Sequence, residues 1–156
     1  MIYEAVNRAL LLQIPDPIER VLDIGCGTGT LGKSLKQGTK CEVIGVTYSH
    51  SEAAFARQWL DLVLVRDLNN FGTSELGAFD CIVCSHILEH LYYPENLLIK
   101  LKHNLTPSGI LIVALPNVLH WKQRLQFLRG RFRYTDGGLM DRTHFRFSTG
   151  KLHWTC

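Results

Sequence analysis

A short apolar segment that runs directly into a glycine-rich bend restricts the fold of this 156-residue chain more than any other feature. Residues 21–24 are mostly apolar, which is typical of a strand buried on both faces of a parallel sheet. Gly25, Gly27 and Gly29 follow at alternate positions, and a helix is expected over 31–36. Glycines let the backbone turn sharply and approach a ligand closely. The segment therefore predicts a nucleotide-type cofactor site at the start of a helix.

The charge of the ligand is indicated by Asp23, two residues before the first glycine. Residues 27–32 match G-x-G-x-x-G, the dinucleotide-binding pattern, but this match alone is weak. A carboxylate at the strand end would repel the pyrophosphate of NAD and attract a cationic ligand such as a sulfonium amino acid. We therefore favour a cationic nucleoside. An ordinary strand–turn–helix, with glycines needed only for packing, is the weaker alternative.

Apolar strands and helices alternate along the rest of the chain. Further strands are expected over 41–46, 61–66, 79–84 and 110–115, helices over 51–59, 94–104 and 118–129, and a turn over 106–109. This alternation predicts βαβ units and one parallel sheet, with ligands bound beyond the carboxyl ends of the strands. We expect a single domain over 1–156, with a short N-terminal helix within 1–19.

Composition and cysteine usage limit the class of protein. Hydrophobic residues make up 46% and charged residues 20% of the chain, which suits one globular domain with a core. No apolar run approaches the length of a membrane-spanning helix. Five scattered cysteines suit a reducing compartment, so a cytoplasmic location is predicted. Cys81 and Cys84 should point to opposite faces of a strand, and no metal site is expected.

The net charge of +3 is unevenly distributed. Residues 117–156 hold eight Lys/Arg, two acidic residues and seven of the fifteen aromatic residues, whereas the preceding 116 residues have a balance of −3. This basic aromatic tail could bind an anionic substrate, nucleic acid or a membrane surface. A solvated helix face beside a small aromatic cluster is an equally acceptable interpretation.

Several motifs together resemble one enzyme family. The D-x-G-x-G-x-G loop at 23–29 is followed by VIGVTYSHSEAAFAR at 43–57, VRDLNNF at 65–71 and a segment containing S-H-x-L-E-H-L within 79–117. Over residues 20–149 the chain resembles class I S-adenosylmethionine-dependent methyltransferases of the methyltransferase-23/type-11-like branch. The resemblance implies a Rossmann-like doubly wound α/β fold, with five parallel strands in the order 3-2-1-4-5 and without the family's usual last two strands. It also implies S-adenosyl-L-methionine as the cofactor.

The resemblance assigns roles at the ends of the strands. The implied cofactor-binding residues are Asp23, Gly25, Cys26, Gly27, Thr47, Tyr48, Asp67, Leu68 and Ser85. Asp67 would accept a hydrogen bond from the adenine amino group, with Leu68 packing on the ring, and Ser85 would lie near the methionyl amino group. Thr47 stands where the family usually has an acidic residue that binds both ribose hydroxyls. A hydroxyl cannot accept two charge-assisted hydrogen bonds, so we expect weaker cofactor affinity or a rotated ribose, with Tyr48 against the adenine.

A hydroxyl acceptor would need a general base, and histidine suits neutral pH. The candidate bases are His144, Asp141, His120 and His86, whereas His90 and His103 are expected to be helix caps or surface residues. We choose His144 with Asp141, because the sequence LMDRTHFRF places them in one turn. A polar turn with a purely structural role is an equally acceptable interpretation.

Residues 116–149 are similar to methyltransferases that often accompany glycosyltransferases of surface-polysaccharide synthesis. This similarity implies a small-molecule acceptor, such as a sugar or a sugar linked to phosphate. Arg124, Arg129, Arg131 and Arg142 could contact its phosphates. An uncovered fifth strand also predicts a homodimer. The alternatives are a non-catalytic S-adenosylmethionine-binding accessory subunit, an RNA methyltransferase and, more remotely, an NAD enzyme, although no separate RNA-binding module is visible.

Overall fold

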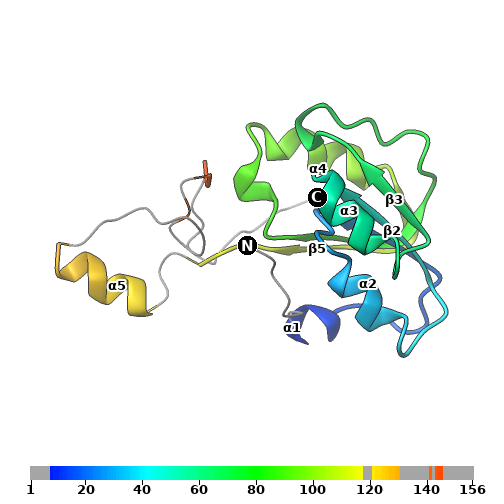
Figure 1. Ribbon diagram of the computed structural model, residues 1–156, viewed down its shortest axis with the longest axis horizontal. Coiled ribbons are helices and arrows are strands. Elements are labelled where there is room, and N and C mark those ends of the chain that lie inside the picture. The colour runs from blue at the N-terminus through cyan, green and yellow to red at the C-terminus, as the bar shows by residue number, and fades with distance from the viewer. Residues whose placement is uncertain (1–7, 118–120, 131–140, 142, 146–156) are drawn as a thin grey trace.

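A five-stranded parallel sheet forms the centre of the computed structural model, which describes residues 8–117, 121–130, 141 and 143–145. The strands are β1 (Arg20–Ile24), β2 (Glu42–Thr47), β3 (Leu62–Val65), β4 (Phe79–Ser85) and β5 (Leu105–Ala114). They lie in the order β3-β2-β1-β4-β5, and each neighbouring pair is parallel (Figure 1). The structure thus confirms the predicted Rossmann-like fold and its strand order.

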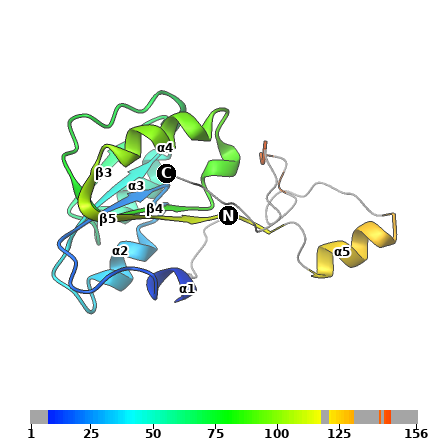
Figure 2. The same ribbon diagram turned by 180° about the vertical axis from the view of Figure 1, so that it is seen from behind.

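Helices cover both faces of the sheet. The elements α1 (Arg8–Leu11), α2 (Thr30–Leu35) and α3 (His50–Ala56) pack on one face, and η1 (Leu68–Asn70), η2 (Leu88–His90) and α4 (Pro94–Lys102) pack on the other. Seen from both sides, α4 lies across the sheet from α2 (Figures 1 and 2). The last helix, α5 (Trp121–Leu128), stands apart from these layers in both views.

The central strands are apolar because both of their faces are buried. Val21 packs into the core beneath α1–α3, whereas Leu22 and Ile24 pack into the core beneath α4, and all three are fully buried. Each such side chain contributes about 1.5–3 kcal/mol through burial. Cys81 lies in the core beneath α1–α3 and Cys84 in the core beneath α4, which confirms that their side chains face opposite sides of the sheet. Burial raises the pKa of the Cys81 thiol to about 12.

The turn predicted over 106–109 is wrong. These residues lie inside β5, where the register with β4 shifts between the pairs Phe79↔Leu105 and Cys81↔Ile110. The Thr-Pro-Ser-Gly sequence therefore forms an irregularity within the strand. Its glycine is required, because a Cβ at Gly109 would lie 2.7 Å from the Phe79 carbonyl oxygen.

The remaining predicted elements are present with small shifts in their ends. α3 begins earlier than expected, because the Ser49 side chain caps the helix by accepting a hydrogen bond from the backbone N–H of Glu52 (3.2 Å). The predicted helices within 1–19 and 118–129 are α1 and α5 in the described residues, and residues 1–7 and 118–120 lie outside these.

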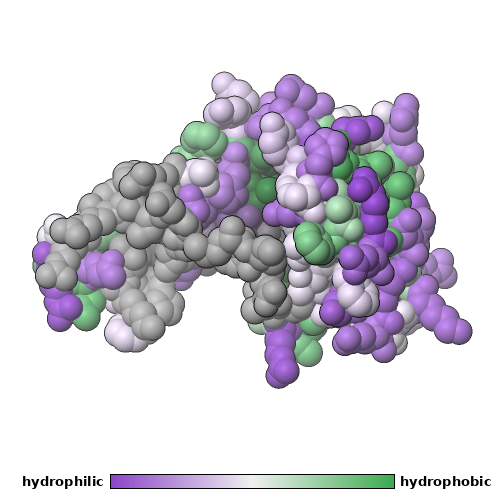
Figure 3. Space-filling view, in the orientation of Figure 1, coloured by the Kyte–Doolittle hydropathy of each residue, from purple (hydrophilic) through white to green (hydrophobic). Residues whose placement is uncertain are grey.

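On the face of the molecule drawn in Figure 3, most of the coloured surface is hydrophilic, with apolar residues in small groups. Within the described ranges, no helix has the length and hydropathy needed to cross a membrane.

Candidate functional site

The glycine bend after β1 has backbone conformations that side chains rarely adopt. Gly25, Gly27 and Gly29 have φ angles of +79°, +52° and +83°. The N–H groups of Gly25 and Cys26 both donate to the Val46 carbonyl oxygen, at 2.8 and 2.9 Å, which attaches the bend to the end of β2. The bend is thus held firmly at the carboxyl edge of the sheet, where ligands bind in this fold.

The bend is open at its second glycine and closed at its first. Among the described residues, no atom beyond Gly27 and its chain neighbours lies within 4 Å of the place where a Cβ on Gly27 would stand. A Cβ on Gly25, in contrast, would lie 2.9 Å from Cγ1 of Ile87, which follows β4. Cys26, included in the predicted cofactor site, has its side chain buried in the core. Gly27 is therefore the position at which a ligand can approach the backbone most closely.

Asp23 carries a carboxylate that is buried but unpaired. Its exposed fraction is 3%, and no hydrogen bond or ion pair reaches its side chain from the described residues. Burial raises the pKa of this carboxyl group to about 7. A buried carboxylate without a partner is unfavourable in the charged form. A cation or a hydrogen-bond donor bound beside Asp23 would therefore stabilise it.

A second carboxylate, which sequence reasoning missed, lies at the end of β2. The Thr47 hydroxyl donates a hydrogen bond to Oε2 of Glu52 at 2.7 Å, and the Ser49 N–H donates to the same hydroxyl at 3.2 Å. Glu52 thus stands beside the position where the family usually has its ribose-binding acid. The S-x-x-E pattern of Ser49 and Glu52, a capping-box sequence, could have indicated this side chain.

The other predicted cofactor residues lie at the same edge, with different exposures. Tyr48 is 77% exposed just after β2, and Ser85 ends β4 half-buried. Asp67 is exposed, and hydrogen bonds from Asn69, chiefly from its backbone N–H, hold the pKa of the carboxyl group below its usual value. Leu68 packs into the core beneath α4. The assigned contacts of these residues with adenine and the methionyl group stay predictions.

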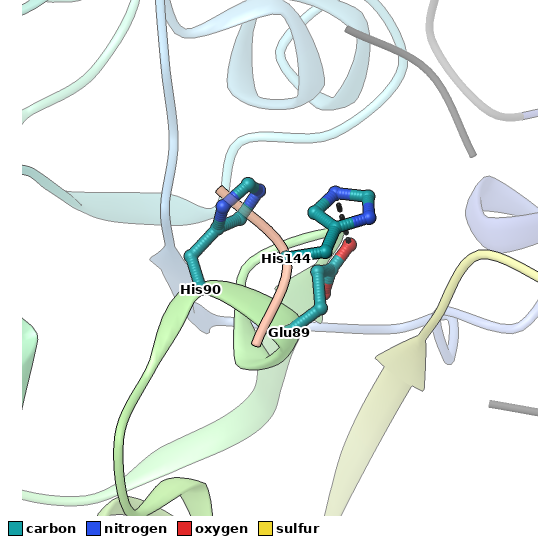
Figure 4. A group of neighbouring side chains, drawn as sticks. All are labelled: Glu89, His90 and His144. Carbon is teal, nitrogen blue, oxygen red and sulfur yellow. Dashed lines mark ion pairs between the residues drawn. The ribbon is translucent and has the colours of Figure 1, made fainter. Parts of the chain in front are cut away.

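A further group of polar side chains lies beyond the end of β4. Glu89 is only 3% exposed, and neither of its carboxylate oxygens has a hydrogen-bond partner in the described part of the chain. Its Oε1 lies 3.7 Å from His86 Nδ1. The same oxygen lies 4.0 Å from His144 Nε2 (Figure 4). His86 itself has a φ of +53°, which is strained for a residue with a side chain. We call Glu89, His90 and His144 the Glu-His cluster.

The segment that carries the predicted catalytic pair packs against this cluster. The Asp141 carboxylate accepts hydrogen bonds from the backbone N–H and the hydroxyl of Thr143, both at 2.8 Å, and these lower the pKa of Asp141. The Thr143 hydroxyl also lies 3.0 Å from His90 Nδ1, and the N–H of Phe145 donates to the Glu89 carbonyl oxygen at 2.8 Å.

The structure therefore brings His144 and Asp141 together with Glu89 and His90, although the sequence indicated only a cap or surface role for His90. His90 and His144 are far apart in the sequence, so local patterns do not indicate that they lie close together. His103 caps the end of α4 as expected, and the candidate His120 lies outside the described residues.

Comparison with known proteins identifies the family. The family model Methyltransf_23, described as a methyltransferase domain, matches residues 3–152, so the chain belongs to this family. The mitochondrial ubiquinone biosynthesis O-methyltransferase of Schizosaccharomyces pombe is 30% identical over 102 residues, which cover 62% of this chain and 37% of that protein. The chain spans less than two thirds of the length of the first curated relatives it matches.

Solved structures show the same fold. A SAM-dependent methyltransferase from Archaeoglobus fulgidus has a TM-score of 0.70 at 23% identity, covering 92% of this chain and 60% of its own. Coclaurine N-methyltransferase, bound to N-methylheliamine and SAH, has a TM-score of 0.57 at 29% identity, and the match covers 68% of this chain and 34% of that protein. Together these comparisons confirm the predicted class, the S-adenosylmethionine-dependent methyltransferases.

Proposed function

We propose that this chain forms the donor-binding part of an O-methyltransferase that acts on a small molecule. The observation that carries the proposal is the buried, unpaired Asp23 carboxylate beside an open glycine bend at the carboxyl edge of the sheet. S-adenosylmethionine supplies the positive charge that such a carboxylate favours. The ubiquinone biosynthesis O-methyltransferases among the relatives support oxygen as the acceptor atom.

Donor binding follows from the arrangement of the strand ends. Gly25 and Gly27 would border the methionine half of the donor, and Glu52 would accept hydrogen bonds from the ribose hydroxyls in place of an acid at Thr47. The exposed ring of Tyr48 would cover the adenine. This arrangement supports donor binding and removes one of the reasons for doubting activity, since Glu52 supplies a carboxylate beside Thr47.

In the proposed reaction, the acceptor oxygen attacks the methyl carbon in line with the carbon–sulfur bond. That bond breaks, its electron pair stays on sulfur, and S-adenosylhomocysteine leaves. The hydroxyl proton passes to His144, and the neighbouring Glu89 carboxylate stabilises the imidazolium that forms. Asp141 acts through Thr143 by fixing the turn that carries His144.

A sugar, or a sugar linked to phosphate, is our proposed acceptor. Arg124 and Arg129 are exposed on and just after α5, where they could contact an anionic group, and Arg131 and Arg142 lie outside the described residues. Because α5 stands apart from the sheet in both views, these arginines suit a long acceptor better than a compact one.

The homodimer and the cytoplasmic location stay predictions. In the described residues β5 pairs only with β4, so a second copy could cover its free edge. Light scattering at micromolar concentration would show twice the mass of one chain, and a monomer mass would contradict the dimer. Cell fractionation tests the location.

A methyl-transfer assay tests the proposed function. The protein is incubated with methyl-labelled S-adenosylmethionine and with nucleotide-sugar or lipid-linked sugar acceptors. We expect label on an acceptor oxygen, and His144→Gln should lower kcat by about 10²-fold or more. His103→Gln, at the cap of α4, serves as the matched control and should leave kcat unchanged. Donor binding without transfer to any acceptor would contradict the catalytic role and favour an accessory subunit.

A further inference from the structure

The Glu-His cluster has the composition of a metal site, although none was expected from the sequence. Glu89, His90 and His144 each offer one ligand atom, and these atoms all lie within 4.8 Å of one another. Figure 4 shows Glu89 and His90 on the η2 turn and His144 on the segment that crosses it. We infer that this cluster binds a divalent transition-metal ion of the Zn²⁺ type.

The Glu89 carboxylate is the first reason for this inference. It is almost completely buried, and both of its oxygens lack a hydrogen-bond partner in the described part of the chain. The two imidazole nitrogens nearest to Oε1, on His86 and His144, lie at 3.7 and 4.0 Å, beyond hydrogen-bond distance. A buried carboxylate without a partner is unfavourable in its charged form. A divalent cation between these groups would supply that partner.

The second reason is that the proton positions on His90 suit a ligand. The Thr143 hydroxyl has one proton, which it donates to Oδ1 of Asp141. The same hydroxyl oxygen must therefore accept the hydrogen bond from His90 Nδ1 at 3.0 Å. The proton of a neutral His90 then lies on Nδ1, and the lone pair on Nε2 is available to a metal. Metal-binding histidines are commonly oriented in this way by a partner of their other ring nitrogen.

The donor set indicates the kind of ion. Two imidazoles and one carboxylate are typical of catalytic zinc sites, in which a fourth position stays open, whereas magnesium and calcium prefer oxygen ligands. Metal–ligand bonds of about 2.0–2.2 Å place ligand atoms roughly 3.4 Å apart in a tetrahedral site. The side chains must therefore move closer than the present 4.8 Å when an ion binds. His86, more than half exposed and near Glu89, could supply the fourth ligand.

The position of the cluster gives the ion a role that rests on the proposed methyl transfer. Ile87, between His86 and the η2 turn, packs against the glycine bend at Gly25, so the cluster adjoins the donor site. A metal there would polarise an acceptor hydroxyl and lower its pKa. With the ion bound, His144 would serve as a ligand in place of its role as the base, and the proton of the polarised hydroxyl would pass to solvent water.

Metal titration tests the inference without donor or acceptor. The full chain is freed of metal with a chelator and titrated with Zn²⁺ by calorimetry and with Co²⁺ by visible absorption. We expect one equivalent of either ion, a tetrahedral cobalt spectrum and no thiolate-to-cobalt charge transfer. Glu89→Gln and His144→Gln should each weaken binding by at least about tenfold, and Thr143→Val by about tenfold through the loss of the oriented His90. His103→Gln should bind as the wild type does.

The outcomes separate this inference from the proposed function. A folded chain that binds S-adenosylhomocysteine but no metal overturns the metal site and leaves the methyltransferase proposal standing. Metal binding that Glu89→Gln and His144→Gln leave unchanged, in variants with wild-type circular dichroism, places the ion elsewhere and also overturns the inference. Metal binding by a chain that does not bind S-adenosylhomocysteine supports the cluster and contradicts the donor site.

Discussion

Replacement of Asp23 by asparagine should stabilise the protein, and by an amount that depends on pH. Burial raises the pKa of Asp23 from 3.8 to about 7, with no partner to offset the effect. The folded state thus holds the proton more tightly than the unfolded state. Consequently, the free energy of unfolding of the wild type falls as the pH rises from about 4 to about 7. Asparagine has nearly the same shape and is neutral throughout this range.

The size of the effect follows from the difference between the two pKa values. At about 1.4 kcal/mol per pH unit, the raised pKa of Asp23 lowers the free energy of unfolding, relative to a neutral side chain, by about 4 kcal/mol at pH 8 and by about 1.5 kcal/mol at pH 5. Asp23→Asn should remove this destabilisation. We therefore expect the variant to be more stable than the wild type at pH 8, with a smaller gain at pH 5.

Urea unfolding followed by circular dichroism at pH 5 and pH 8 measures this difference. Asp67→Asn is the matched control, because hydrogen bonds lower the pKa of this exposed carboxyl group, and no gain in stability should appear. A variant less stable than the wild type at pH 8, or a gain independent of pH, would refute the reasoning. The same variant should lose affinity for S-adenosylmethionine more than for S-adenosylhomocysteine, which lacks the sulfonium charge.

Three further predictions concern the donor site. Glu52→Gln should weaken binding of S-adenosylmethionine by about tenfold in calorimetry, because a charge-assisted hydrogen bond is lost. Glu42→Gln, which removes the surface ion pair with Arg20, is the control and should leave this binding unchanged. Thr47→Asp should lower the free energy of unfolding, because it places a second carboxylate beside Glu52; a gain in donor affinity from this change would contradict the role given to Glu52. Gly27→Ala should lower the free energy of unfolding in urea by about 1 kcal/mol and reduce donor binding, because the φ of Gly27 is +52°. Gly38→Ala should be tolerated, because Gly38 has neither a positive φ nor a close neighbour. Equal behaviour of the two alanine variants would show that the bend does not approach a ligand.

The sheet could be predicted from the sequence because its central strands are buried on both faces and therefore appear as apolar runs. The order of the strands came from the resemblance to a family. The error at 106–109 has a physical cause, since proline, serine and glycine favour a turn and an irregularity within a strand equally well. Only the pairing of Leu105 with Phe79 distinguishes the two.

The site could be predicted only in part. Asp23 and the glycines were found because they are neighbours in the sequence. The approach of Glu52 to Thr47 depends on how the chain enters α3, and the contact of His90 with Thr143 joins residues 53 positions apart. Such contacts are produced by tertiary packing, so local patterns do not show them.

Calorimetry with three ligands shows whether the bend at Gly25–Gly29 beside Asp23 binds a cationic donor. The full chain is titrated separately with S-adenosylmethionine, S-adenosylhomocysteine and NAD. We predict one site that binds the first two ligands and not NAD, and a lower affinity for S-adenosylmethionine in Asp23→Asn. Binding of NAD in their place, or of neither sulfur nucleoside by the folded chain, would contradict this prediction.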